Sequence, residues 1–199
     1  MPIRAVYLSA LLLAAAVACQ RAVRADSDSG AVPESLAHDP ATRAEIATWT
    51  VRSDVYGRLP LGILLTQANT VLGDSLPVDY AKLDLCQMVR SPMLPTGLRF
   101  LVERDSVGAP LRIDRVDVDS GSTQTAEGAA IGDTEARIHQ LYGNRVKVQP
   151  HKYVPTGHYL VIDATTDTLH RLVFETDGEK VVKFRAGRKP AIDYVERCG

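Results

Sequence analysis

LGILLTQANTVLG at residues 61–73 is matched seventy residues later by IGDTEARIHQLYG at residues 131–143. The offset aligns three apolar pairs: Ala68 with Ile138, Val71 with Leu141, and Leu72 with Tyr142. These positions recur at i, i+3 and i+4, which is the spacing of one helix face. Gly73 and Gly143 fit the left-handed position just beyond a helix C-terminus. The two stretches therefore predict two equivalent short helices.

A second pair of matched blocks follows the helices, because Arg99–Asp105 aligns with Arg171–Asp177 at an offset of seventy-two. Each block is followed by turn residues and another apolar run, which is typical of a hairpin. Four further strands are expected: Leu85–Arg90, Leu111–Val118, Tyr159–Asp163 and Val181–Arg185. Each half then contains one helix and three strands. The pattern predicts an α+β fold of two tandem helix-plus-antiparallel-sheet repeats, residues 47–122 and 123–199.

This order of glycine, short helix, Leu/Tyr-Gly and hairpin, over residues 57–187, resembles two known groups. One is the small outer-membrane lipoproteins of the assembly-factor type, the SmpA/OmlA domain. The other is the β-lactamase inhibitor protein, itself a tandem helix-plus-sheet repeat. The segments 174–178 and 184–188 also look like those of uncharacterised proteobacterial lipoproteins. The resemblance implies a binding module, and it assigns no functional residue.

The first eighteen residues are typical of a signal peptide. Arg4 gives a positive start, and an almost unbroken apolar run covers Val6–Ala18. At about 1.5 Å per residue the run reaches only about 20 Å, which is short of a hydrocarbon core of roughly 30 Å. Residues 1–18 are therefore predicted to direct export and to be removed.

The tetrad Ala16-Val17-Ala18-Cys19 resembles the lipobox of bacterial lipoproteins, which implies that Cys19 is acylated and becomes the first residue of the mature chain. By the same resemblance, Gln20 in place of Asp implies sorting to the outer membrane of a Gram-negative bacterium, facing the periplasm. The alternative is an ordinary secretory peptide cleaved near Ala18 or Ala25.

Residues 19–46 are predicted to form a lipidated, disordered tether. The segment is rich in Asp, Ser, Ala and Pro and lacks aromatic residues and periodicity, so it cannot offset the entropy of ordering. Ordered structure is expected to begin near Ala47, with a half-buried strand over Ala47–Tyr56. The 23 basic and 24 acidic residues are spread along the chain and form no basic stripe, which argues against nucleic-acid binding.

Cys86 and Cys198 remain once Cys19 is assigned to the lipid. An even count in an exported chain favours one disulfide. Closing so long a loop could stabilise the fold by roughly 4 to 5 kcal/mol on the chain-entropy model. Two separate buried thiols are the alternative.

The densest polar cluster is a candidate ligand site made of His151, Lys152, Tyr153, His158 and His170. Imidazoles are common zinc and copper ligands, and His158 and His170 could approach across a hairpin. The spacing fits no known metal motif, however, so we predict neither a metal nor a cofactor. The competing interpretation is that these are exposed residues of loops and strand ends.

Alternation in the last hairpin could place Lys183 and Arg185 on one sheet face. Such a basic strip could meet an acidic partner or lipid phosphate, although a solvated face balanced by Glu175 is favoured. Glu103 with Asp105, and Glu175 with Asp177, are likewise expected on solvated faces rather than as catalytic pairs.

No nucleophile elbow, phosphate-binding loop, dinucleotide fingerprint or zinc-helix motif is present in the sequence, so no enzyme is predicted. The function favoured by the sequence is a membrane-anchored, non-catalytic module that binds another envelope protein. The alternatives are a small-ligand or metal-binding lipoprotein, and an envelope hydrolase without a legible motif. A pocket converging on the three histidines would favour a ligand, whereas an exposed apolar surface would favour a protein partner.

Overall fold

The computed structural model describes residues 39–196 and 198. The predictions for the signal peptide, Cys19 and most of the tether lie outside these residues. Within the described residues, no helix has the length and apolar character needed to cross a membrane.

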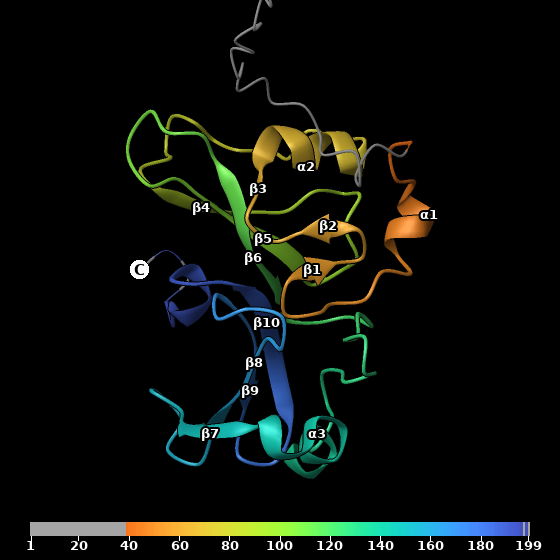
Figure 1. Cartoon of the computed structure of the whole chain (residues 1–199), viewed down its shortest axis with the longest axis vertical. Helices are drawn as coiled ribbons and strands as arrows, with labels where there is room; N and C mark the ends of the chain where they lie inside the picture. Colours follow the sequence, from red (N-terminus) through yellow and green to blue (C-terminus); the bar gives the residue numbers. More distant parts are fainter. Residues whose placement is uncertain (1–38, 197, 199) are drawn as a thin grey trace, which may run out of the picture.

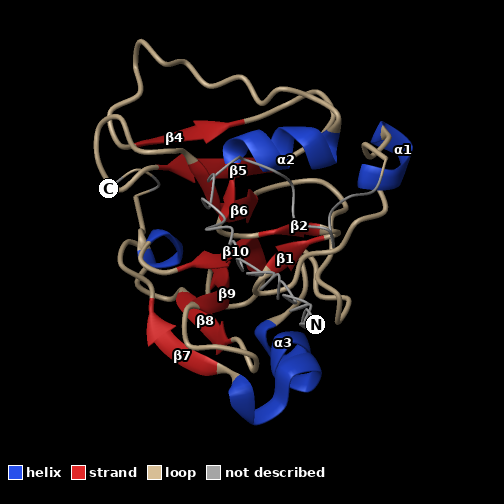
Figure 2. Cartoon of the chain, turned by 45° about the horizontal axis from the view of Figure 1, so that its top comes forward, coloured by secondary structure: helices blue, strands red, loops and turns tan. Residues whose placement is uncertain are grey.

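One antiparallel sheet dominates the fold (Figures 1 and 2). In spatial order its strands are β4 (Cys86–Val89), β5 (Leu98–Glu103), β6 (Arg112–Val118), β10 (Val181–Arg188), β9 (His170–Thr176), β8 (His158–Asp163) and β7 (Lys147–Pro150). A short strand, β3 (Ile63–Leu64), also pairs with β6. The predicted hairpins β5–β6 and β9–β10 are confirmed, whereas β7 was not expected from the sequence.

The predicted α+β class with two separate repeats is wrong, because this is mainly a β fold. Strands β6 and β10 pair directly, with Phe184 opposite Val118 and Gly187 opposite Arg115, so the two halves share one sheet. A Cβ on Gly187 would lie 2.4 Å from the Asp114 carbonyl oxygen, and this absent side chain permits the close approach. Glycine spacing indicated where helices end, but it carried no information about pairing between the halves.

The helices of the described residues are short: α1 (Arg43–Ile46), α2 (Leu65–Leu72) and α3 (Glu135–Tyr142), which runs into the 3-10 turn η2 (Gly143–Arg145). The apolar stripe predicted on α2 is buried. Gly73 ends this helix in the predicted left-handed conformation, with φ 64° and ψ 19°. Gly143 also has positive φ, but its ψ of −136° lies outside the left-handed helical region. The two helix ends are therefore not equivalent.

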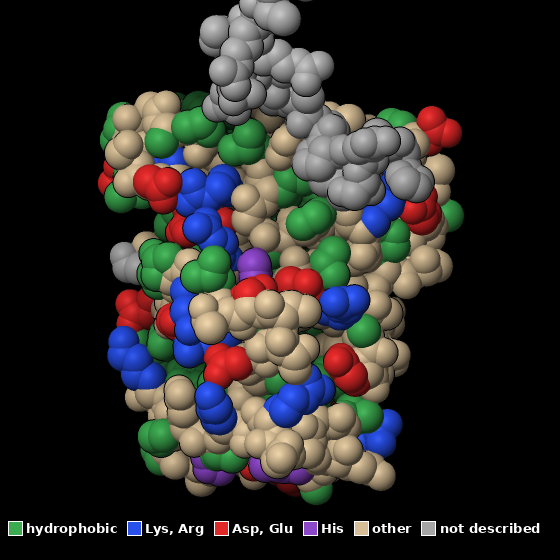
Figure 3. Space-filling model, viewed as in Figure 1, with side chains coloured by type: hydrophobic (Ala, Val, Ile, Leu, Met, Phe, Trp, Pro, Cys, Tyr) green, Lys and Arg blue, Asp and Glu red, His purple; other side chains and the backbone are tan. Residues whose placement is uncertain are grey.

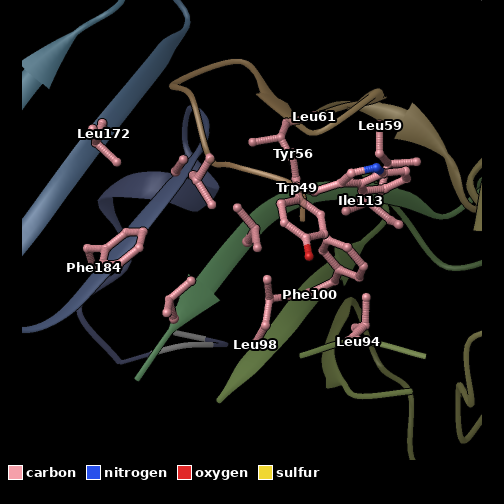
Figure 4. Close-up of a cluster of buried hydrophobic side chains, with 14 of the residues drawn as sticks. Trp49, Tyr56, Leu59, Leu61, Leu94, Leu98, Phe100, Ile113, Leu172 and Phe184 are labelled. Atoms are coloured by element: carbon pink, nitrogen blue, oxygen red, sulfur yellow. The ribbon is translucent and has the colours of Figure 1, made fainter. Parts of the chain in front are cut away.

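The sheet face that meets the helices, here called the apolar face, carries the main core. Figure 4 shows Phe100, Ile113 and Phe184 of the sheet in one cluster with Trp49 and Tyr56. Tyr56 packs edge-on against Phe100, with ring centroids 6.1 Å apart. Burial of so much aromatic and aliphatic area is the main stabilising contribution to a fold of this size.

The segment before the sheet is ordered earlier than the sequence predicted. Ala41 and Ile46 are buried, and Tyr56 donates a hydrogen bond to the Ile46 carbonyl oxygen at 3.1 Å. The expected strand over Ala47–Tyr56 is reduced to an isolated bridge at Val51 and the two-residue strand β1 (Val55–Tyr56), which pairs with β2 (Leu59–Pro60). Within the segment assigned to the tether, Ala41 and Ile46 pack on the core, and Arg43–Ile46 forms α1.

The opposite face, here called the charged face, is covered by the end of the chain. The C-terminal strap comprises residues 189–196 and Cys198, and includes the 3-10 turn η3 (Ala191–Asp193). In Figure 1, η3 lies on one side of β10, and β1, β2 and α3 lie on the other. The predicted disulfide is present, and it joins Cys198 of the strap to Cys86 of β4 with a Cα–Cα distance of 5.8 Å.

Candidate functional site

The residues of the predicted ligand cluster do not converge. His158 and His170 stand at opposite ends of the β8–β9 hairpin, because Tyr159 pairs with Glu175 and Asp163 pairs with Arg171. The His158 Nδ1 lies 2.8 Å from a Glu135 oxygen, and the His170 Nδ1 lies 2.9 Å from an Asp167 oxygen. Among the described residues, no group of three His, Cys, Asp or Glu side chains is arranged to hold a metal ion.

His151 belongs instead to the charged face. Its Nδ1 accepts the backbone N–H groups of Tyr153 and Val154, each at 3.1 Å. The Nε2 therefore carries the hydrogen and faces a Glu175 oxygen at 3.3 Å. The ring also stacks on Tyr159 at a centroid distance of 4.5 Å. His151 is thus fixed as a structural side chain within this fold.

Lys152 and Tyr153 hold the strap rather than an external ligand. The Lys152 Nζ lies 3.1 Å from a Glu196 oxygen, and the Tyr153 hydroxyl donates to the same oxygen. The Lys152 ammonium also lies 5.0 Å from the centre of the Tyr153 ring. The two contacts with Glu196 join the loop after β7 to the strap.

Two arginines of the central strands bind the strap through its backbone. The Arg115 Nη1 donates to the carbonyl oxygens of Ala191 at 2.7 Å and Tyr194 at 3.0 Å. The Arg185 Nε donates to the Ile192 carbonyl oxygen at 2.9 Å. Arg115 is 1% exposed and Arg185 is 6% exposed, so neither is a solvated surface cation. The sequence favoured a solvated face here; this expectation is wrong for Arg185, which the strap covers.

Glu175 compensates the buried Arg185 and is itself only 2% exposed, whereas the buried Arg115 pairs with Asp117 at 2.8 Å. Arg185 forms an ion pair with one oxygen, and Lys183 lies 2.8 Å from the other. Burial alone would raise the pKa of Glu175, but the hydrogen bond and charge of Lys183, with Arg185 and His151, outweigh it and hold the pKa below its ordinary value. The expectation of a solvated Glu175 is wrong, although Asp177 is exposed as predicted.

Glu103 lies under the other end of the strap and shows the opposite electrostatic behaviour. Its pKa is raised from 4.5 to about 7, mainly because burial disfavours the carboxylate and because Asp114 provides a hydrogen bond and a negative charge. A cavity of about 460 Å³ beside it is lined by Tyr194, Pro190 and the Cys86–Cys198 disulfide, among others. Glu103 was expected to be solvated, so this prediction is also wrong.

A separate surface at one end of the sheet exposes large apolar side chains. The apolar end surface comprises Tyr80, Leu85 and Val107, which are 67%, 44% and 74% exposed. The loop and the turn that carry them meet where the Arg104 amide donates to the Leu85 carbonyl oxygen at 2.9 Å. A groove of about 310 Å³ adjoins them, lined by Leu64, Leu65, Thr66, Tyr80, Arg104, Gly108, Ala109, Pro110 and Leu111.

Figure 3 shows hydrophobic side chains in the upper part of the view, where α2 and these loops lie. Clusters of exposed apolar residues beside a groove often mark interaction sites, whereas single ones do not. Sequence reasoning missed this surface because its three residues come from loops without a motif. Only their apolar character in polar surroundings could have indicated it.

Comparisons of the chain with protein-family models, with curated proteins and with solved structures found no match. The resemblance to outer-membrane lipoproteins therefore stays a prediction.

Proposed function

We propose that this protein is an exported lipoprotein, anchored through Cys19 to the periplasmic face of the outer membrane, whose folded domain binds another envelope protein. The export signal and the lipobox resemblance support this localisation. The Cys86–Cys198 disulfide agrees with it, since such bonds persist in oxidising compartments.

The observation that carries the binding proposal is the apolar end surface. Its side chains come from neighbouring loops, and they flank a groove whose walls are mainly aliphatic. Tyr80 offers a large rigid ring at little entropic cost, which is a frequent property of interface anchors. Arg104 lines the same groove. Its Nε and Nη2 donate to the Asp84 and Leu83 carbonyl oxygens, and its Nη1 can donate to a partner's carbonyl or carboxylate group. A partner segment with aliphatic side chains and an acidic or carbonyl group suits this surface.

Site-specific photocrosslinking in intact cells tests the binding proposal. A photoreactive residue at position 80 is expected to capture one envelope protein reproducibly, and a Val107→Asp substitution in the same chain is expected to abolish the crosslink. Val148 supplies the matched control, because it is 51% exposed but lies on the edge strand β7. Equal capture from positions 80 and 148, or no capture from position 80, would contradict the proposal.

Membrane fractionation tests the proposed localisation separately from the binding proposal. Cys19→Ser is expected to release the domain from membranes, because the acyl chains are the proposed anchor. Persistence of the variant in salt-washed membranes would contradict lipidation at Cys19 without bearing on the apolar end surface.

A further inference from the structure

A cleft of about 320 Å³ lies where four segments distant in the sequence meet, and we call it the junction cleft. It is formed by the loop before β1, the loop between β6 and α3, the end of α3 with η2, and the β8–β9 turn. Its lining residues are Arg52, Ser53, Asp54, Ala126, Glu127, Tyr142, Arg145, Ile162, Asp163, Ala164, Thr165, Thr166 and Leu172. The volume is within the range of small-molecule sites, which is about 300 to 1,000 Å³.

The inner part of the junction cleft is apolar and rigidly held. Tyr142, Ile162 and Leu172 line it, and each is at most 3% exposed. The Tyr142 ring packs against Phe174 of the core at a centroid distance of 5.7 Å. These side chains form the packed floor of the cleft, and the loops that carry Arg52, Glu127 and Thr165 form its rim.

Two guanidinium groups line the same cleft. The Arg145 guanidinium lies 5.4 Å from the centre of the Tyr142 ring, and the described residues give it no ion pair with a carboxylate. The Arg52 Nε lies 3.6 Å from the Asp54 Oδ1, which is too long for a hydrogen bond. Both cations thus retain donors that a carboxylate ligand could use.

Acceptors for a positively charged group are also present. The Asp54 Oδ1 is buried and has no hydrogen-bond partner among the described residues. The same oxygen lies 3.6 Å from the Arg52 Nε, and the Asp54 side chain as a whole is 28% exposed, so part of the carboxylate is open to a donor in the cleft. The Glu127 carboxylate lies 2.9 Å from the Tyr142 hydroxyl. Burial raises the pKa of Tyr142, so the phenol stays protonated and donates to Glu127.

We propose that the junction cleft binds a small zwitterion, of which a free amino acid such as leucine is a simple case. Its carboxylate pairs with Arg145 and Arg52, and its ammonium group donates to the exposed part of the Asp54 carboxylate. This site is independent of the proposed protein partner, since none of its lining residues belongs to the apolar end surface.

Calorimetric titration of the purified full-length chain with L-leucine tests the proposal. Two half-analogues separate the charges: 4-methylpentanoate lacks the ammonium group, and 3-methylbutylamine lacks the carboxylate. We expect saturable binding of L-leucine with a dissociation constant below about 10 mM. Each half-analogue should bind with a dissociation constant at least about tenfold higher. No saturable binding of L-leucine, or equal binding of either half-analogue, would overturn the proposal.

Variants then assign the binding to the cleft. Arg145→Gln and Asp54→Asn are each expected to weaken L-leucine binding by about tenfold, because each removes one charge-assisted contact. Arg137→Gln is the matched control, since Arg137 is an exposed residue of α3 whose guanidinium contacts only Gln140 at 2.8 Å among the described hydrogen bonds. Thermal unfolding confirms that each variant is folded before titration. Unchanged affinity in a folded Arg145→Gln variant would place the ligand elsewhere and overturn the assignment.

Discussion

Phe184 and Arg185 are adjacent in β10, yet they are buried by different means. Phe184 points to the apolar face, where it lies 5.6 Å from the Phe174 ring in a large continuous core. Arg185 points to the charged face, where an ion pair with Glu175 and the Ile192 carbonyl oxygen of the strap surround its guanidinium. The apolar cluster of that face is small and consists of Tyr159, Val161, Val173 and Ile192, with Val195 partly buried.

The difference shows that the charged face is buried because the strap covers it. Arg115 contacts the strap across sequence separations of 76 and 79 residues, so nothing near it in the sequence indicates its cover. The apolar face is stabilised by area removed from water, and this contribution needs no specific partner for each side chain. The charged face is stabilised only while each buried charge keeps its partner, because an unpaired buried charge is costly.

Phe184→Ala should have the largest effect, because it leaves a cavity in the continuous core. We expect a loss of about 3 to 5 kcal/mol in the free energy of unfolding, measured by urea denaturation. Val182→Ala on the same strand serves as the control, since Val182 is 42% exposed and should cost far less. Equal losses for the two variants would show that the apolar face is not the dominant core.

Removing the disulfide should have the next largest effect and should act on the charged face. The Cys86→Ser, Cys198→Ser double variant opens a link between residues 112 apart, for which we expect a loss of about 2 to 4 kcal/mol. Hydrogen exchange should accelerate at the strap and β4 more than at β9 and β10. Uniform acceleration along the chain would contradict the idea that the strap opens separately from the sheet.

The sequence predicted what depends on local pattern. The α2 stripe, the left-handed Gly73 and the two hairpins follow from spacing and turn chemistry, and the cysteine count indicated the disulfide. The pairing of β6 with β10 was not predictable in this way, because strand alternation does not specify a neighbour. The burial of Glu175 and Arg185 was missed for a related reason, since polar alternation is the same for a solvated face and for one covered by a distant segment.

Arg185→Met should cost about 2 to 3 kcal/mol, because it leaves the buried Glu175 with fewer compensating charges. Adding Glu175→Leu should recover at least half of that loss, since both members of the buried pair are then replaced by apolar groups. Urea denaturation of the two single variants and the double variant gives the coupling directly. Additive losses would contradict the central role of this ion pair. For Phe184→Ala, by contrast, we expect no single second substitution to recover the lost stability in the same way.

The smallest expected effect is on how the free energy of unfolding depends on pH. In this respect Glu103 and Glu175, two carboxylates of the charged face, should behave oppositely. Successive side chains of β5 alternate between the two sheet faces, so Glu103 points away from the apolar face that holds Phe100 and Val102. Glu103 and Glu175 therefore both face the strap. Because the pKa of Glu103 is raised in the folded state, its protonated form is favoured there. Its stabilising contribution is complete below pH 4.5 and is lost as the pH rises from 4.5 to about 7.

The lowered pKa of Glu175 gives the opposite sign, since its contribution is present above its unfolded pKa and is lost as the pH falls. Glu103→Gln should therefore be more stable than the unmodified chain at pH 8, by about 1 to 2 kcal/mol, and the difference should shrink toward pH 4.5. Glu175→Gln should be less stable than the unmodified chain at pH 8, and this difference should narrow in acid. Urea denaturation of both variants from pH 4 to 8 makes the comparison. Parallel curves for the two variants would show that the strap does not create distinct environments for the two glutamates.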